Sequence, residues 1–480
     1  MQYFEALTSW LWGTPLLVII IACGLIFSIR SKFFQIAHLG LIIRNPFKKD
    51  PELKDSKNSL TPFQAVSIAV GGSVGVSNIS GVGTAIATGG PGALFWLWIA
   101  ALIGMIIKMA EVSLAVYYRR TNPDGTYTGG PTYYMERGLG EQRGWKGWKI
   151  LAILFGFGIF MNLFISIQNY TVSEAIGSTF GISYLIPGVL LFIGVLAISM
   201  GGVKKVGQIA SYLVPFMCVF YIVCVIIVLV MNASAIPGAF GMIFESAFTG
   251  KAAVGGFAGA TVAAAMQKGF ARSVYSNEAG WGTSPMVHAT ANTNHPIKQG
   301  LLGAFEVFMD TIVVCSATGL LVIITGYWDS GLQGATLTLT ALEANVGFIA
   351  RMIVAICIYL FALTTGTGWC TYYQCVLGHM IGDSKAKPFL LKLCAFLNPL
   401  CGFICTLVTV IAGGTPAEIW VFADFTTIIP TFVNVAVLLI LGGKFIELLK
   451  DYKARYLGIG QVDPNFSLFY EDEMKEKTQK

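Results

Sequence analysis

Long apolar runs recur along most of the chain, and short polar segments separate them. A helix needs about 20 apolar residues to cross the hydrocarbon core of a membrane. Scanning on that basis gives about eleven such segments, with approximate limits 12–30, 61–89, 91–118, 148–176, 184–202, 206–232, 253–286, 300–326, 347–377, 388–412 and 414–443. We therefore predict an all-α, polytopic membrane protein with about eleven transmembrane helices.

Lysine and arginine residues lie in alternate connections between these segments. They follow the first, third, fifth and last spans, as Arg44 and Lys48, Arg119 and Arg120, Lys204 and Lys205, and Lys444, Lys450, Lys453 and Arg455. Cytoplasmic connections carry an excess of positive charge, so we predict a multi-pass protein of the cell membrane with its N-terminus outside and its C-terminus in the cytoplasm. The segments 32–50 and 235–250 are expected to lie along the cytoplasmic and outer surfaces, respectively.

The composition supports a membrane protein and argues against several other classes. Only 12% of the residues are charged and the mean hydropathy is +0.70, whereas soluble domains average about 25% charged residues. Most of the ten cysteines lie in apolar runs, which favours buried thiols over disulfides or zinc sites. The sequence contains neither GxxxxGK nor HExxH, which disfavours ATP-driven transport and zinc hydrolysis. The basic loops explain the net charge of +6 without a nucleic-acid partner.

Ten of the eleven spans form two groups of five. Residues 61–233 and 253–443 hold these groups, and an odd number of spans per group inserts them in opposite orientations, as in an inverted repeat. We expect residues 1–60 to form an extra N-terminal transmembrane helix and an amphipathic segment. Residues 234–252 are then an outer connection, and residues 444–480 a cytoplasmic tail.

The first span of each group has a polar, glycine-bearing centre. The two stretches read GGSVGVSNISGVGTAIATGGPG at 71–92 and KGFARSVYSNEAGWGTSP at 268–285. Irregular backbone at membrane depth is tolerated only where protein or water surrounds it. Free amides at a restarting helix hold a carboxylate, and the carbonyls left behind hold a small cation. The pattern predicts two interrupted helices that bind an amino acid zwitterion and sodium.

The second interruption is expected at residues 274–277. Ser276 and Asn277 are favourable N-cap residues, and we expect Glu278 in the first turn of the restarting helix. An alternative explanation makes the glycines packing residues of the GxxxG kind. That explanation fits Gly81 and Gly90, but it does not account for polar residues such as Asn78.

Three motifs resemble the alanine/glycine:cation symporter family, that is, the sodium:alanine symporters. They are GGSVGVSNISGVGTAIATGGPGALFWLW, KGFARSVYSNEAGWGTSP and DGTYTGGPTYYMERGL, and the resemblance extends over nearly the whole chain. It implies the LeuT-type fold, with five plus five inverted helices and one extra span. It also implies sodium-coupled import of small neutral amino acids, such as alanine and glycine, by alternating access.

The resemblance further implies which residues bind the substrate. They come from the two breaks and from the fourth and ninth spans, and are Gly75, Val76, Ser77, Asn78, Phe164, Gln168, Val274, Tyr275, Ser276, Asn277 and Trp369. The first break and Asn78 would meet the carboxylate, the second break would supply carbonyls for the ammonium group, and Trp369 would cap the pocket. Phe164 and Gln168 are expected on one helix face. The family usually has glycine where Ser77 stands, which leaves substrate identity open.

The family's sodium position would use three carbonyls and two hydroxyls. These belong to Gly71, Val74, Phe361, Thr364 and Thr365. The two threonine hydroxyls have an alternative role, because threonine often bonds back to carbonyls of its own helix. We expect no cofactor besides the transported sodium, and no obligatory protein partner.

Charged residues also fall within the spans. Lys108 and Glu111 are spaced as neighbours on one helix and are expected to form a structural pair, whereas Asp310 is the candidate if protons drive transport. A proton-coupled or glutamine-preferring carrier of the same fold is therefore the alternative function. A channel or a membrane-embedded enzyme are the alternatives from other classes. An enzyme is not expected, because GTSP and GTGWC lack a paired base and metal ligands.

Overall fold

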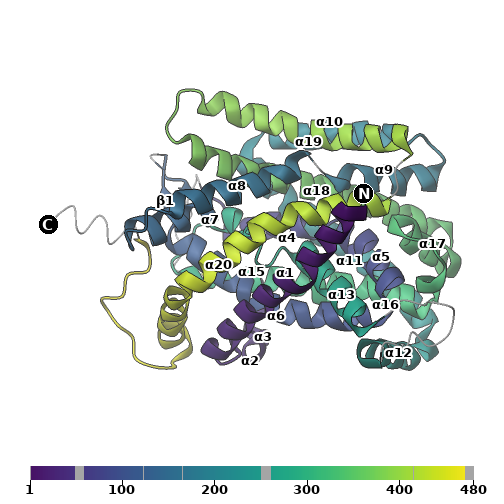
Figure 1. Cartoon of the computed structure of the whole chain (residues 1–480), viewed down its shortest axis with the longest axis horizontal. Helices are drawn as coiled ribbons and strands as arrows, with labels where there is room; N and C mark the ends of the chain where they lie inside the picture. Colours follow the sequence, from purple (N-terminus) through teal and green to yellow (C-terminus); the bar gives the residue numbers. More distant parts are fainter. Residues whose placement is uncertain are drawn as a thin grey trace.

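The computed structural model describes residues 2–48, 59–122, 124–164, 166–249, 261–413 and 416–470. These residues form a helical bundle with one short hairpin, β1 (Arg120–Thr121) and β2 (Tyr127–Thr128). Figure 1 shows the start of α1 (Gln2–Ser31) near the end of the bundle that carries α12 (Ile236–Thr249) and α17 (Gly334–Val346), with β1 at the opposite end. This arrangement agrees with the N-terminus and the basic connection at 119–147 being on opposite sides. Which side faces the cytoplasm stays a prediction.

The first predicted group contains an interrupted helix followed by further long helices. Its elements are α4 (Pro62–Ser73), η2 (Ser77–Gly81), α5 (Val82–Gly89), α6 (Gly92–Tyr117), α8 (Trp148–Phe164), α9 (Ile167–Phe180), α10 (Leu185–Ser199) and α11 (Gly202–Met231). Short helices α2 (Phe34–Ala37) and α3 (Leu39–Arg44) follow α1. The connection after α6 holds α7 (Pro131–Tyr134) and the π-helix η3 (Met135–Glu141).

The second group repeats the order of an interrupted helix and long helices. Its elements are α13 (Val262–Asn277), α14 (Pro285–His288), α15 (Pro296–Val307), η5 (Phe308–Cys315), α16 (Ser316–Ile324), α17, α18 (Phe348–Ile381), α19 (Lys387–Ala412) and α20 (Pro416–Leu457). Within the described ranges, eight helices are long and apolar enough to cross a membrane, and the bent pair of α4 with η2–α5 makes a ninth. The shorter α10 and α13 are the further predicted spans, so the count of eleven stays a prediction.

The first interruption lies where the sequence predicts it. A reciprocal pair of hydrogen bonds fixes the start of α4, since Thr61 Oγ1 accepts from the Gln64 amide at 3.1 Å and Gln64 Oε1 accepts from the Thr61 amide at 3.0 Å. The helix then ends at Ser73 and a π-helical turn begins at Ser77, with the two arms bent by 45°. The prediction of an interrupted second span is confirmed.

The second interruption lies several residues later than predicted. Helix α13 runs unbroken to Asn277, and an irregular segment covers 278–284 before α14. Glu278 ends the helix in the left-handed conformation (φ 55°), and Gly280 and Gly282 also have positive φ. The prediction that Ser276 and Asn277 cap a restarting helix, with Glu278 in its first turn, is therefore wrong. Asn277 Oδ1 instead accepts from the Ala279 amide at 2.9 Å, which closes the first arm. Residues 253–260 of the predicted span lie outside the described residues.

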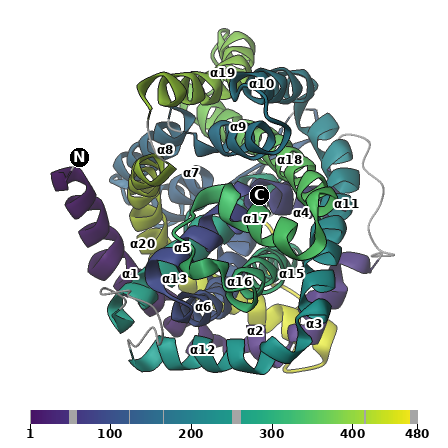
Figure 2. The same ribbon diagram turned by 90° about the vertical axis from the view of Figure 1, so that its right-hand side faces the viewer.

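Two further features differ from the sequence prediction. The span at 148–176 is divided, because α8 ends at Phe164 and α9 begins at Ile167 after an extended Ser166 (φ −109°, ψ 113°). Helix α17, which was not predicted, packs against η2, α9 and α18. Figure 2 shows α17 in the centre of the face that also carries α5 and α16. A short helix thus covers the first interruption from that side.

Candidate functional site

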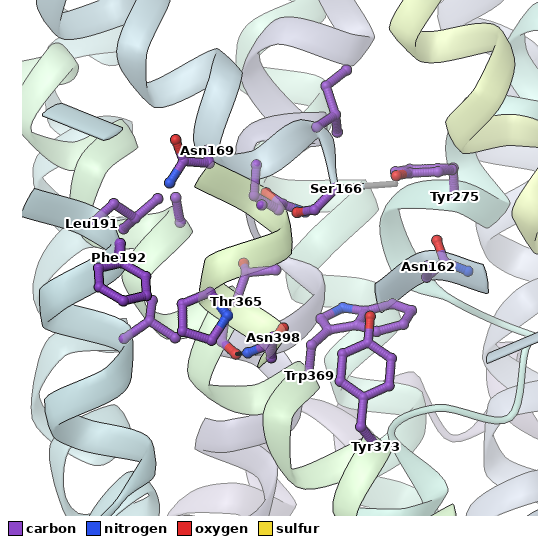
Figure 3. A pocket seen from close by; sticks show the side chains of 17 residues that line it. Asn162, Ser166, Asn169, Leu191, Phe192, Tyr275, Thr365, Trp369, Tyr373 and Asn398 are labelled. Carbon is purple, nitrogen blue, oxygen red and sulfur yellow. Dashed lines mark hydrogen bonds between the residues drawn. The ribbon is translucent and has the colours of Figure 1, made fainter. Parts of the chain in front are cut away.

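A cavity lies between α9, α10, α18 and α19 and extends to Tyr275 of α13. Of the predicted substrate and sodium residues, Gln168, Tyr275, Thr365 and Trp369 line it. Figure 3 shows Trp369 and Tyr373 on one side and Leu191 and Phe192 on the other, with Thr365 and Asn398 between them. The cavity therefore has aromatic and aliphatic walls and a small number of polar groups, as is typical of sites for small molecules.

At Gly75, the first interrupted helix lies close to two residues that line this cavity, Thr365 and Gln168. A side-chain carbon on Gly75 would lie only 2.7 Å from Thr365 Oγ1 and 3.7 Å from Gln168 Oε1. Glycine is thus required here, since any larger residue would push into the threonine hydroxyl. The close approach brings the backbone of the break, the threonine and the glutamine to one place.

Two buried polar atoms at the cavity lack partners. Gln168 Oε1 and Asn162 Nδ2 are inaccessible and make no hydrogen bond with any described residue. Leaving a buried polar atom unpaired costs about 1–3 kcal/mol, so such atoms indicate a place for a ligand or an ordered water. An unpaired acceptor beside Gly75 suits a donor such as an ammonium group.

Trp369 connects the cavity to the second interruption. Its indole N–H donates to Glu278 Oε1 at 3.1 Å, and its ring lies edge-on to Trp281 with 5.0 Å between centroids. The other carboxylate oxygen of Glu278 accepts from the Thr283 hydroxyl. The orientation of the tryptophan thus depends on the conformation of residues 278–284.

The residues of the predicted sodium site also gather near the cavity. Thr365 Oγ1 donates to the Gly71 carbonyl at 3.0 Å, across the contact between α18 and α4. Thr364 Oγ1 instead donates to the Phe361 carbonyl of its own helix at 2.9 Å. Thr364 is nevertheless close to Gly71, because a side-chain carbon added to Gly71 would lie 3.1 Å from Thr364 Cβ. Val74 terminates α4. The alternative role, a hydrogen bond to a carbonyl of the same helix, therefore applies to Thr364 but not to Thr365.

A buried aspartate joins the two interrupted helices. Asp310 Oδ1 in η5 accepts from Asn78 Nδ2 at 2.6 Å and from Ser276 Oγ at 3.1 Å. Asn78 Oδ1 also accepts from the Gly75 amide at 2.8 Å, and Asn277 Nδ2 donates to Thr311 Oγ1 at 2.9 Å. These polar groups hold the breaks in place and do not line the cavity. Their contact with substrate stays a prediction.

Phe164 does not line the cavity, although it was expected to contact the substrate. It is 63% exposed at the end of α8. The expectation of one face shared with Gln168 is wrong, because it assumed a continuous helix and the chain is interrupted between them. Val76, Ser77 and Val274 are buried behind the cavity rather than along it.

Several residues of the cavity were not predicted from the sequence. They are Asn162, Ser166, Asn169, Leu191, Phe192, Val195, Tyr373, Asn398 and Gly402, among others. Polar residues inside the apolar runs at 148–176 and 388–412 were the available signal, because such residues in a membrane helix face the interior of the bundle.

Comparison with known proteins places these features in a family. The sequence model of the sodium:alanine symporter family matches residues 1–465. The sodium/alanine symporter AgcS of Methanococcus maripaludis is 38% identical over 392 residues, covering 80% of this chain and 84% of that protein. The probable sodium/glutamine symporter GlnT of Bacillus subtilis is 35% identical over 468 residues, covering 97% of this chain and 92% of that protein.

Solved structures support the fold. The crystal structure of MhsT in complex with L-phenylalanine superposes with a TM-score of 0.58 and 13% identity, covering 81% of this chain and 90% of that chain. At this identity the similarity concerns the fold alone, and that fold is the LeuT type.

Proposed function

This chain belongs to the sodium:alanine symporter family, and on that premise we propose that it imports a small neutral amino acid together with sodium by alternating access. One observation carries the proposal. At the first break, Thr365 holds the Gly71 carbonyl at 3.0 Å, while Gly75 lies beside the unpaired Oε1 of Gln168. A cation site and an amino acid site thus share one interruption.

Each group at the break has a distinct role in this proposal. The amides that follow Gly75 attract the substrate carboxylate, and Gln168 Oε1 accepts from its ammonium group. Sodium binds the Gly71 carbonyl and the Thr365 hydroxyl, with Val74, Phe361 and Thr364 completing its oxygen ligands. Sodium would thereby hold α4 against α18 and position the break for the substrate. A sodium ion that crosses about 100 mV contributes about 2.3 kcal/mol.

The walls of the cavity favour a small side chain. Trp369, Phe192 and Leu191 are bulky and face the same space (Figure 3). We therefore propose alanine and glycine as substrates, and AgcS, a relative named as a sodium/alanine symporter, agrees with this.

A glutamine-preferring carrier is the second candidate. The unpaired Nδ2 of Asn162 lies at the cavity and can donate to a side-chain amide of the substrate. The relative GlnT is named as a probable sodium/glutamine symporter. Whether Asn162 is reached by a side chain or by water distinguishes the two candidates.

Uptake by purified protein in proteoliposomes tests the proposal. Labelled alanine, glycine and glutamine would be offered with an inward sodium gradient, and again with potassium in place of sodium. We expect concentrative alanine uptake that requires sodium. Accumulation that is unchanged in potassium would contradict sodium coupling, uptake that stops at equal concentrations would indicate a channel, and uptake of glutamine alone would favour the second candidate.

A further inference from the structure

A second cavity lies between the end of α1, the last turns of α20 and the chain segment that follows α20. Its volume is about 520 Å³, and sites for small molecules typically measure about 300–1,000 Å³. It shares no residue with the substrate cavity. The predicted spans 12–30 and 414–443 end at or just before the residues that line it. The second cavity therefore lies at the level of the lipid headgroups, on the side that the charge pattern predicts to be cytoplasmic.

Positively charged side chains are prominent in the second cavity. Four of its lining residues are basic, namely Arg30, Lys32, Lys450 and Lys453. Lys453 donates to the Ser31 carbonyl at the end of α1 at 3.1 Å, which is a common role for lysine at a helix C-terminus. The other three form no side-chain hydrogen bond or ion pair with a residue that the structure describes. Capping of α1 therefore accounts for one of the four charges and leaves three.

The acidic residues of the second cavity do not balance these charges. Glu447 pairs with Lys444 at 2.6 Å and Asp451 pairs with Arg455 at 2.7 Å, and both of these partners lie outside the lining. The Asp463 carboxylate accepts from a backbone amide at 2.9 Å. The four lining cations and these two partners make six positive charges against three carboxylates. The excess of positive charge attracts an anion.

Lys32 has an unusual backbone conformation at the edge of the second cavity. Its φ is 61°, and that of Phe33 is 51°. A left-handed residue at the end of a helix is usually glycine, because a side chain strains this conformation. The turn itself closes α1 by backbone bonds, from the Lys32 amide to the Ile29 carbonyl at 3.0 Å and from the Phe33 amide to the Ser28 carbonyl at 2.6 Å. Glycine would form the same turn with less strain, so the lysine at this position points to a role for its side chain.

One buried acceptor of the second cavity has no partner. The Asp451 side chain is 4% exposed, and its Oδ2 accepts from Arg455 Nε at 2.7 Å and lies 3.2 Å from His295 Nε2. Asp451 Oδ1 has no hydrogen-bond partner within the described ranges. Such an atom indicates a ligand that donates a hydrogen bond, or an ordered water. A ligand with a phosphate and a hydroxyl group satisfies both the cations and this acceptor.

Exposed apolar side chains of α1 lead to the second cavity. Val18, Ile26 and Ile29 are 56%, 41% and 63% exposed. Ile26 lies four residues before Arg30, on the same face of the helix. At 1.5 Å per residue, the distance along α1 from Val18 to Arg30 is about 18 Å, comparable with half of the hydrocarbon core, about 15 Å. Acyl chains can therefore lie along α1 below a headgroup in the cavity, which favours a membrane lipid over a soluble phosphate compound.

We propose that the second cavity binds the headgroup of an anionic phospholipid that carries hydroxyl groups, such as phosphatidylglycerol. Its phosphate lies among Arg30, Lys32 and Lys450, and a headgroup hydroxyl donates to Asp451 Oδ1. Basic pockets on the cytoplasmic side of membrane proteins are suited to such headgroups. The same chemistry occurs in soluble glycerol phosphate, and the experiment below separates the two sources. The proposal does not depend on the transported substrate, because the two cavities share no residue.

Native mass spectrometry of the purified full-length protein tests the proposal. It would be titrated with phosphatidylglycerol, phosphatidylethanol and phosphatidylethanolamine of equal acyl chains, and with soluble glycerol phosphate. Phosphatidylethanol has the same charge as phosphatidylglycerol but no hydroxyl, so we expect it to bind about fivefold more weakly. Phosphatidylethanolamine has no net charge and should bind about tenfold more weakly. Glycerol phosphate lacks acyl chains and should bind about a hundredfold more weakly.

Each ligand comparison can overturn a different part of the proposal. Equal affinity for phosphatidylglycerol and phosphatidylethanolamine overturns the anionic site. Equal affinity for phosphatidylglycerol and phosphatidylethanol overturns the role of Asp451. Glycerol phosphate that binds as tightly as the lipid overturns the membrane source.

Two variants and one control locate the site. Lys32→Gln and Lys450→Gln should each weaken the binding of phosphatidylglycerol about fivefold, and neither removes a hydrogen bond or ion pair within the described part of the chain. Lys392→Gln of α19 is the matched control, because Lys392 is also exposed but does not line the cavity, and its affinity should match the wild type. Equal weakening in all three variants overturns the location. Wild-type affinity in both cavity variants, each folded by gel filtration, also overturns it, and if one variant does not fold the other decides.

Discussion

Replacing Thr365 with valine removes one oxygen and little else. Valine and threonine are both β-branched and have nearly the same shape, so the packing between α18 and α4 should persist while the polar contact is lost. The change deletes the hydroxyl that donates to the Gly71 carbonyl at 3.0 Å. The methyl group of valine takes the place of that hydroxyl beside Gly75, whose side-chain position lies 2.7 Å from the hydroxyl oxygen. The substitution therefore tests the proposed sodium ligand and not the fold.

The expected magnitude follows from what the hydroxyl contacts in each state. Without sodium, the lost hydrogen bond is a neutral one and costs about 1 kcal/mol of stability. With sodium, the oxygen faces a full charge, and such contacts contribute about 1.5–3 kcal/mol. The sodium affinity changes by the difference between these two losses, about 0.5–2 kcal/mol. Because about 1.4 kcal/mol corresponds to a factor of ten, the sodium concentration for half-maximal uptake should rise by about 2- to 30-fold.

The assay is alanine uptake into proteoliposomes over a range of sodium concentrations. Thr367→Val is the matched control, because the Thr367 hydroxyl is equally buried but donates within α18, to the Thr364 carbonyl at 3.0 Å. We expect less than about a twofold change in the control, since its hydroxyl has no part in the site. The reasoning is refuted if Thr365→Val keeps the wild-type sodium dependence, or if both variants shift equally.

Three further predictions concern the cavity and the connection between α14 and α15. Gln168→Met removes the unpaired acceptor, so it should raise the KM for alanine by about tenfold, with a smaller effect on sodium dependence. Uptake kinetics measure this, and an unchanged KM would exclude Gln168 as a substrate ligand. Trp369→Phe deletes the bond to Glu278 and should admit larger substrates, which competition by methionine and leucine would reveal and unchanged selectivity would contradict. Burial lowers the pKa of His295 from 6.5 to about 4, despite its bond to Asp451. As the pH falls, the unfolded chain therefore binds a proton before the folded protein does. The neutral His295 contributes about 3 kcal/mol to the free energy of unfolding, and this contribution is complete above pH 6.5 and is lost as the pH falls to about 4. Thermal unfolding of the detergent-solubilised protein should therefore depend less steeply on pH in His295→Gln.

The sequence predicted those features that follow from the cost of polar groups in lipid. Gly71, Gly75 and the polar residues between 71 and 92 are out of place in a continuous membrane helix, and the structure has an interruption there. The proximity of Thr365 to Gly71 was expected from the family resemblance, which placed both among the sodium ligands. The interruption can be inferred from local chemistry, which a sequence contains, whereas the contact between the two distant residues cannot.

The features that were missed depend on tertiary contacts. Ser276 and Asn277 have the chemistry of helix caps, but Asp310 and Thr311 bind them as members of a continuing helix, which overrides the local preference. Phe164 was placed by assuming an unbroken helix, and nothing in FMNLFISIQNY marks an interruption at Ser166. The position of a break within a polar segment is set by what the partner helices offer.

The contacts around the two breaks fall into two kinds, and the difference bears on how the carrier moves. Asp310 bonds to Asn78 of η2 and to Ser276 of α13 from within η5, and all three residues are buried. These bonds involve no cavity atom, so substrate and sodium need not disturb them. The interrupted helices are instead held to α18 by Thr365 on Gly71 and by Trp369 on Glu278. Both of these bonds lie at groups where a ligand can bind or a charge can change. We therefore expect the two interrupted helices and η5 to move as one unit, with α18 as the surface against which they shift.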